Sequence, residues 1–264
     1  MPSEQTSSPA LTMQSVTKRF GGVVAVSEAS IVVKGGEVHG LIGPNGAGKS
    51  TTIGLITGFI RPTSGSIRYG DADLSKQAPH AIVRKGVSRT FQQAAPLVGL
   101  SVIENVMAGF HTSFRSNFFE TALTLPRARR EQREAFSKAR ELLELVGLAD
   151  QANMEAKELT FGKLRFLEIA RALAMEPKIL LLDEPAAGLN ELETERLASL
   201  IRDRRSTGMG FLLVDHDVNF VFGLSDRVTV MNFGSVIANG TPAEVNAMPI
   251  VREAYLGGAP QGVH

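Results

Sequence analysis

The chain has 264 residues, with 28 Lys and Arg against 27 Asp and Glu, a formal net charge of +1 and 43% hydrophobic residues. A chain of this length can bury a hydrophobic core without disulfide bonds or structural metals. Its near-neutral charge gives no electrostatic support for nucleic-acid binding. Because the chain contains no cysteine, a disulfide framework, a cysteine-ligated zinc site and a thiol nucleophile are excluded.

The N-terminal half predicts strands after a short tail. Residues 1–10, MPSEQTSSPA, are rich in Ser and Pro and have neither the basic start nor the apolar run of a secretory signal, so a disordered tail is expected. The sequence from Leu11 to Tyr69 is typical of β-strands. Short strand-like runs occur at 23–26, 31–33 and 66–69, and glycine pairs at 21–22 and 35–36 separate them. These runs predict an antiparallel layer.

Three later runs have another character, since 38–42, 179–182 and 211–214 are almost wholly apolar. Continuous apolar strands predict a parallel sheet that is buried on both faces. No run suits a transmembrane helix, because the longest charge-free stretch, 228–243, contains Asn, Gly, Thr and Pro.

Helical patterns lie between these strands. One helix face is formed by Phe136, Ala139, Leu142, Leu143 and Val146, and Gly147 follows as a C-terminal cap. Leu164, Leu167, Ala170 and Ala174 mark a second helix, and residues 232–235 predict a turn between two late strands. The fold class is therefore α/β in one domain, with a helical portion inserted after the first strands.

Residues 43–51, GPNGAGKST, match the phosphate-loop pattern G-x-x-x-x-G-K-[ST] and follow an apolar strand. Glycines let backbone N–H groups turn toward phosphates, and the N-terminus of the following helix adds partial positive charge. Lys49 is expected to bridge the β- and γ-phosphates, and the Ser50 hydroxyl to ligate Mg²⁺. The alternative is a glycine-rich turn without a ligand.

A second motif, LLLDE at 180–184, ends in two acidic residues. This pair favours hydrolysis of the nucleotide by water over phosphate transfer to a substrate hydroxyl. Asp183 at the end of a buried strand can hold Mg²⁺ through water, and Glu184 can orient or deprotonate a water that attacks the γ-phosphate. No Asn-Lys-x-Asp guanine motif occurs, which counts against a GTPase. The alternative is a pair of strand-end charges that face solvent.

From Leu11 to Gly257 the chain resembles the ATP-binding subunit of an ABC transporter. The motifs that carry the resemblance occur in the family's order: GPNGAGKST at 43–51, Phe91-Gln92, LTFGK at 159–163, LLLDEP at 180–185, AGLN at 187–190 and Asp215-His216-Asp217. The resemblance implies an ATPase that binds ATP and Mg²⁺ on a P-loop NTPase (RecA-like) core with an antiparallel β subdomain and an inserted helical subdomain. The implied boundaries are 11–257 for the single ATPase domain, about 11–91 and 176–240 for the core with its β layer, about 92–175 for the helical subdomain, 241–257 for a C-terminal segment and 258–264 for a tail.

The family's site roles transfer to matching positions. The resemblance implies four catalytic residues: Lys49, Gln92, Glu184 as general base and His216 as the γ-phosphate switch. It implies metal contacts by Ser50, Gln92 and Asp183. The implied nucleotide contacts are Phe20 on the adenine, the loop residues Gly43, Pro44, Asn45, Gly46, Ala47, Gly48, Lys49, Ser50 and Thr51, and Thr160 and Gly162 on a nucleotide held by a second subunit. The alternatives are a core role for Phe20, a solvated loop for Gln92 and a structural role for His216.

The signature segment departs from the family's usual LSGGQ. Thr160 keeps a hydroxyl and Gly162 keeps the fourth-position glycine, whereas Phe161 and Lys163 replace glycine and glutamine. Lys163 either adds a positive charge near the γ-phosphate or points to solvent. Asn190 replaces the family's usual aspartate and loses its charge.

More local motifs, among them KRFGG at 18–22, DEPAAGLN at 183–190 and ANGTP at 238–242, resemble the ATPase of branched-chain, hydrophobic amino-acid importers. That resemblance implies work at the cytoplasmic face of the inner membrane with transmembrane permease subunits, a second ATPase subunit (identical or paralogous) and a soluble binding protein, and no nucleic acid. The alternatives are a urea or amide importer, a lipopolysaccharide exporter, or a regulatory subunit that hydrolyses ATP weakly. The insert 111–130, rich in Phe and Arg, either docks on a permease or headgroups or is a solvated helix start.

Overall fold

The computed structural model describes residues 9–90, 96–110 and 126–256. Its strands are β1 (Leu11–Phe20), β2 (Val23–Val33), β3 (Val38–Ile42), β4 (Ser64–Tyr69), β5 (Ala72–Asp73), β6 (Val87–Arg89), β7 (Ile179–Asp183), β8 (Gly210–Val214), β9 (Arg227–Asn232) and β10 (Ser235–Gly240). Its helices are α1 (Lys49–Ile56), α2 (Pro79–Val83), α3 (Val102–Gly109), α5 (Pro126–Leu145), α6 (Phe161–Ala174), α7 (Glu191–Ser206), α8 (Val218–Leu224), α9 (Pro242–Ala247) and α10 (Pro249–Leu256), with 3₁₀ turns η2 (Ala149–Gln151) and η3 (Ala156–Glu158).

The strands form two sheets. A four-stranded antiparallel sheet has the order β2-β1-β4-β5, and a six-stranded sheet has the order β10-β9-β3-β8-β7-β6. In the larger sheet β6, β7, β8, β3 and β9 run parallel, and β10 pairs antiparallel with β9. The α/β class and the parallel order of the three apolar runs are therefore confirmed.

The central strands are apolar throughout because their alternate residues enter two different cores. Leu41, Leu181 and Leu212 face α1 and the antiparallel sheet, whereas Ile42, Leu182 and Leu213 belong to the core shared with α6, α7 and α8. Since successive side chains of a strand point to opposite faces, a strand covered on both sides has no polar face.

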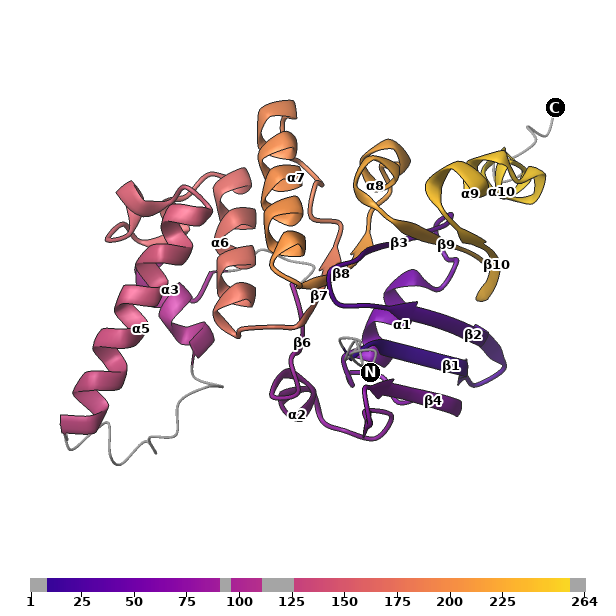
Figure 1. Ribbon diagram of the computed structural model, residues 1–264, viewed down its shortest axis with the longest axis horizontal. Helices are drawn as coiled ribbons and strands as arrows, with labels where there is room; N and C mark the ends of the chain where they lie inside the picture. The colour runs from indigo at the N-terminus through magenta and orange to yellow at the C-terminus, as the bar shows by residue number, and fades with distance from the viewer. Residues whose placement is uncertain (1–8, 91–95, 111–125, 257–264) are drawn as a thin grey trace, which may run out of the picture.

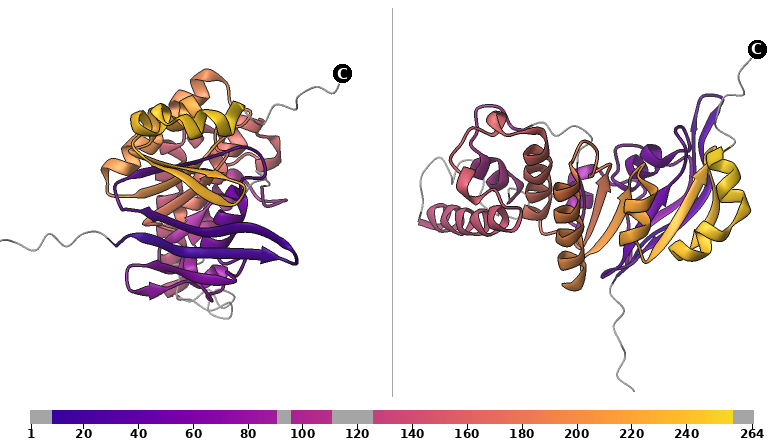
Figure 2. Two further views of the ribbon diagram at one scale, coloured as in Figure 1. Left: turned by 90° about the vertical axis from the view of Figure 1, so that its right-hand side faces the viewer. Right: turned by 90° about the horizontal axis from the view of Figure 1, so that it is seen from above.

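The helices α3, α5 and α6 lie together at one end of the long axis, and α9 and α10 lie beside β9 and β10 toward the other end (Figure 1). The right view of Figure 2 shows the helical group at one end of the long axis, apart from the antiparallel sheet, which lies toward the other end. None of the helices in the described ranges combines the length and the hydrophobicity needed to cross a bilayer.

Most differences from the expected elements are local. The runs at 23–26 and 31–33 belong to one strand, β2, whose register with β1 shifts near Glu28, a residue with a φ of 47°. The predicted apolar face of α5 is confirmed at Ala139, Leu143 and Val146, which are buried, but not at Phe136, which is 44% exposed while Ala135 is buried. The cap at Gly147 is confirmed by its φ of 62°, and the turn at 232–235 by the break between β9 and β10.

Candidate nucleotide-binding site

The motif residues meet at one edge of the larger sheet. β3, β8 and β7 are parallel neighbours, and Leu41, Val214 and Asp183 lie in one row of their register. The phosphate loop follows β3, Asp215 and His216 follow β8, and Glu184 follows β7. Segments far apart in the sequence are thus brought to one edge, at the carboxyl ends of strands where ligands bind in open α/β sheets.

The phosphate loop is shaped by glycines that no other residue can replace without strain. Gly43 has a φ of 154° and Gly48 a φ of 102°. A Cβ atom on Gly43 would lie 2.2 Å from the Met231 carbonyl oxygen, and one on Gly48 would lie 2.6 Å from the Ala25 carbonyl oxygen. The loop is also tied to the β9–β10 turn, because the Gly234 N–H donates to the Ala47 carbonyl at 3.0 Å. Packing from β2 and β9 therefore holds the loop in place.

Lys49 begins α1 and is fixed over the loop. Its ammonium donates to the carbonyl oxygens of Gly43 at 2.6 Å and Pro44 at 3.1 Å. Burial lowers the pKa of Lys49 from its ordinary value, and the carboxylates of Glu184 and Asp183 oppose that effect. Gly48 caps the helix without a side-chain hydrogen bond, and no acidic residue lies in the first turn. The N-terminus of α1 and Lys49 thus form a positive site that faces two carboxylates.

Asp183 is only 4% exposed at the end of β7. Burial raises the pKa of its carboxyl; Arg89, whose Nη2 lies 3.9 Å from Asp183 Oδ2, opposes that effect, whereas Glu184 adds to it. The Asp183 backbone N–H donates to Thr90 Oγ1 at 3.4 Å, so the residue that follows β6 is tied to the backbone at the end of β7. Gln92 lies two residues further on, outside the described residues.

We expect Asp183→Asn to increase the free energy of unfolding near pH 7, measured by urea denaturation without nucleotide or Mg²⁺. Because the folded-state pKa lies above the ordinary 3.8, the ionised carboxylate costs stability above that raised pKa. The gain should therefore disappear as pH falls through the raised pKa and below the ordinary one. Asp203→Asn, at an exposed carboxylate, should change nothing. An Asp183→Asn variant that is less stable at pH 7 would show that the Arg89 ion pair outweighs burial.

Glu184 has a φ of 49°, a left-handed conformation that costs a non-glycine residue about 1–3 kcal/mol. Its N–H donates to the Val214 carbonyl at 2.7 Å, and its carbonyl accepts from Ala187 N–H at 3.2 Å. The strain is therefore held by the neighbouring strand and by the turn that follows. Its side chain is half-buried, and its carboxylate is close enough to Lys49 to raise the pKa of that ammonium.

His216 is held by a residue to which the sequence analysis assigned no role. Asp215 is 1% exposed; its Oδ1 accepts from the Asp217 N–H at 3.0 Å and lies 3.3 Å from His216 Nδ1, and its Oδ2 accepts from the Ala186 N–H at 3.2 Å. The buried carboxylate thus joins the segment after β7 to the His216 ring, which is 67% exposed. The sequence shows that an acidic residue precedes the histidine, but it does not show that this residue accepts a hydrogen bond from the Ala186 N–H.

Phe20 is not a core residue, because it is 49% exposed at the end of β1. The Lys18 ammonium lies 4.7 Å from its ring centre. The Ala25 carbonyl, next to Gly48, belongs to the strand that follows the Phe20 turn. The ring is therefore available to an aromatic ligand near the loop, and its adenine role stays a prediction.

Thr160 and Gly162 lie at the start of α6, one of the helices of the helical group. Thr160 is exposed and makes no capping hydrogen bond to its own helix, while Gly162 is buried. Lys163 is half-buried. Asn190 caps α7: its Oδ1 accepts from the Glu193 N–H at 2.9 Å and its own N–H donates to Glu193 Oε2 at 3.0 Å.

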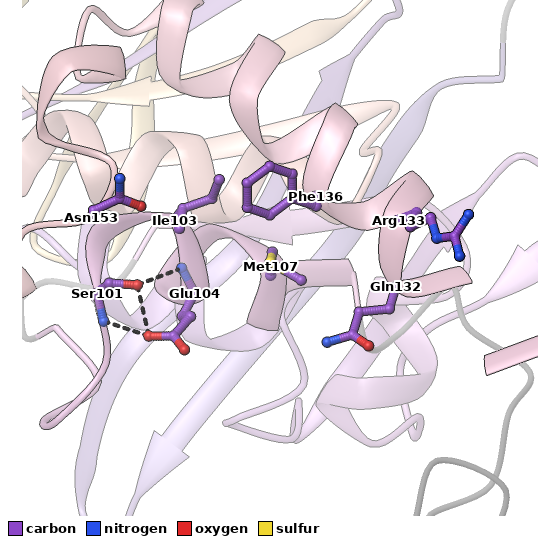
Figure 3. A pocket seen from close by; sticks show the side chains of 8 residues that line it. All are labelled: Ser101, Ile103, Glu104, Met107, Gln132, Arg133, Phe136 and Asn153. Atoms are coloured by element: carbon purple, nitrogen blue, oxygen red, sulfur yellow. Dashed lines mark hydrogen bonds between the residues drawn. The ribbon is translucent and has the colours of Figure 1, made fainter. Parts of the chain in front are cut away.

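A groove of about 530 Å³ lies in the helical group, between α3 and α5 (Figure 3). Ile103, Met107 and Phe136 form its apolar part, and the Ser101–Glu104 capping box closes one end. Ser101 N–H donates to Glu104 Oε2 at 2.8 Å. The remaining lining residues are Gln132, Arg133 and Asn153.

Residues 26–187 match the family model of the ABC transporter. The chain belongs to the ABC transporter family, of which it is an ATP-binding ATPase subunit. A second model, the branched-chain amino acid ATP-binding cassette transporter, matches residues 235–260, which include β10, α9 and α10.

Curated relatives and solved structures are ATP-binding proteins of the same family. The chain is 43% identical to the high-affinity branched-chain amino acid transport ATP-binding protein LivG of Salmonella typhimurium, over 96% of this chain and 100% of that one. It is 36% identical to the lipopolysaccharide export ATP-binding protein LptB of Acidithiobacillus ferridurans, over 94% and 96%. The crystal structure of the ADP conformation of MJ1267, an ATP-binding cassette of an ABC transporter, superposes with a TM-score of 0.82 at 31% identity, covering 94% of this chain and 99% of that one. The P-loop NTPase class is therefore confirmed.

Proposed function

We propose that the chain hydrolyses ATP at this sheet edge to energise the uptake of branched-chain or other hydrophobic amino acids. The observation that carries the proposal is the common edge of β3, β8 and β7, where Lys49 faces both Asp183 and Glu184. Loop N–H groups and Lys49 bind the phosphates, Glu184 takes a proton from the attacking water, and His216, held by Asp215, contacts the γ-phosphate. Gln92 is assigned to the metal or the water by the family resemblance alone.

The residues present fit Mg²⁺. The Ser50 hydroxyl is exposed at the start of α1, and Asp183 is a buried carboxylate next to Lys49. Mg²⁺ that arrives with a nucleotide is held by few protein oxygens and by phosphates, so an all-protein cage is not required. When bound, it supplies charge neutralisation for the β- and γ-phosphates.

A second ATPase subunit completes each site in this proposal. Thr160 and Gly162 stand at the start of α6, and an exposed hydroxyl at a helix N-terminus suits a phosphate of the nucleotide that the other subunit holds. Identical and paralogous second subunits both satisfy this arrangement. The helical group within 92–175 then acts as the subdomain that presents the signature segment.

The amino-acid cargo is supported by LivG and by the match of the C-terminal segment 235–260. We place the subunit at the cytoplasmic face of the inner membrane, bound to permease subunits that receive cargo from a soluble binding protein. Purification of the tagged chain from its native membrane, with identification of what co-purifies and of the solute that stimulates ATPase activity, tests this. Co-purification with a lipopolysaccharide export machinery, or stimulation by urea or amides and not by amino acids, would overturn the cargo.

We also propose that the groove between α3 and α5 receives a cytoplasmic segment of a permease, because Phe136 in its apolar lining is 44% exposed and α3 is the helix that follows the Gln92 segment. Phe136→Asp should lower permease co-purification by about tenfold or more, since a charge would enter the apolar part of the interface. ATP binding should be unchanged. Val32→Ser, at an exposed residue of β2, is the control. Full retention of the permease by Phe136→Asp would exclude the groove as the docking site.

A further inference from the structure

Phe161, the aromatic residue in the signature segment, packs on the turn that follows the catalytic strand of its own chain. Gly188 in that turn has a φ of 76°, and a Cβ atom there would lie 2.6 Å from Phe161 Cε1 and 3.1 Å from Cδ1. The Arg165 guanidinium, one helical turn later, lies 5.4 Å from the ring centre. The ring is therefore in contact both with the Gly188 backbone and with a cation of α6.

The next signature residue makes a second contact with the same region. A Cβ atom on Gly162 would lie 2.3 Å from Glu193 Oε1. The Glu193 carboxylate is fixed by its capping box with Asn190, which closes the turn before α7. Two consecutive residues of the signature segment thus lie against the two ends of the segment 188–193.

This segment leads directly back to Glu184. The Ala187 N–H donates to the Glu184 carbonyl at 3.2 Å, and the Leu189 N–H donates to the Ala186 carbonyl at 3.1 Å. Two overlapping turns therefore connect Glu184 to Gly188. Gly188, which the Phe161 ring contacts, lies four residues after Glu184, whose backbone has a left-handed conformation.

We propose that Phe161 is a positioning residue that couples the two nucleotide sites of the dimer, by joining the signature segment to the turn that places Glu184 in the same chain. The inference rests on the proposed function: the signature segment contacts the nucleotide of the second subunit, while Glu184 acts on the chain's own nucleotide. Contact of the signature segment with the second subunit's nucleotide then holds the Gly188 turn, and with it Glu184, in the hydrolytic arrangement. A glycine at position 161 would lack the ring that makes this connection.

Phosphate release by the full chain, purified with its membrane partners, tests the proposal with Phe161→Ala and Phe161→Tyr. The alanine variant should lose about tenfold in kcat, while the affinity of the chain for ATP and its unfolding midpoint stay as in wild type. The tyrosine variant keeps the ring and should keep kcat. An alanine variant with the wild-type kcat, or one that loses ATP affinity to the same extent as kcat, would overturn the proposal.

A double-mutant cycle with Gly188→Ala separates contact from general damage. Gly188→Ala alone should lower kcat, because its methyl group meets the Phe161 ring. In the Phe161→Ala background the clash with the ring is removed and only the strain of an alanine at a φ of 76° remains, so the double variant should lose less than the product of the two single losses. A double variant whose losses multiply would contradict the coupling. Wild-type phosphate release no faster than that of Glu184→Gln would instead overturn the proposed function itself.

Discussion

Glu184→Gln is expected to leave ATP binding intact and to slow phosphate release by about 10²- to 10⁴-fold, the range that a general base contributes. Glutamine keeps the size of the side chain but cannot accept a proton from the attacking water. The backbone of Glu184 is held by its N–H donation to the Val214 carbonyl at 2.7 Å, which the substitution leaves in place. Equilibrium binding of ATP and single-turnover phosphate release on the same preparation measure the two effects separately.

Glu141→Gln is the matched control, because Glu141 is an exposed carboxylate on α5, in the helical group. It should bind and hydrolyse ATP as the wild-type chain does. If Glu184→Gln releases phosphate at an undiminished rate, another group takes the proton and the assignment of Glu184 is wrong.

Lys49→Ala is expected to weaken ATP binding by about 100-fold or more, because charge-assisted hydrogen bonds to phosphate contribute a few kcal/mol when they are partly buried. The loop carbonyls of Gly43 and Pro44, 2.6 and 3.1 Å from Nζ, hold the ammonium where α1 begins. Burial lowers the pKa of Lys49, so the charged side chain does not stabilise the fold and its loss should leave the unfolding midpoint unchanged or higher.

Calorimetric titration of ATP, together with thermal unfolding, checks this expectation. Lys34→Ala removes the same charge from an exposed position and should bind ATP normally. Unaltered ATP affinity in Lys49→Ala would mean that the phosphates do not lie at this loop.

Local patterns predicted much of this fold. The strands β3, β7 and β8 could be predicted from their apolar runs alone, because a strand that is covered on both faces has no polar face. The glycines of the phosphate loop predicted backbone conformations with positive φ, which other residues avoid, and Gly43 and Gly48 adopt such conformations. Short elements with weak patterns, such as β6 (Val87–Arg89), were not predicted.

Contacts between distant segments could not be predicted from those patterns. The row of Leu41, Val214 and Asp183 depends on strand order, which local periodicity does not encode. The same holds for Asp215 with Ala186 and for Phe161 with Gly188, since each pair joins different elements. The exposure of Phe136 at a groove, with Ala135 buried instead, could not be predicted either, because it depends on how α3 and α6 pack against α5.

Leucine uptake by the reconstituted transporter tests the central claim most directly. The chain, the permease subunits that co-purify with it and their binding protein would be placed in vesicles, with ATP on the side of the ATPase. We predict accumulation of radiolabelled leucine that requires ATP hydrolysis and is abolished in the Glu184→Gln complex. Leucine accumulation that is the same with the Glu184→Gln complex, or ATP hydrolysis by the complete wild-type complex without uptake of any hydrophobic amino acid, would contradict the account.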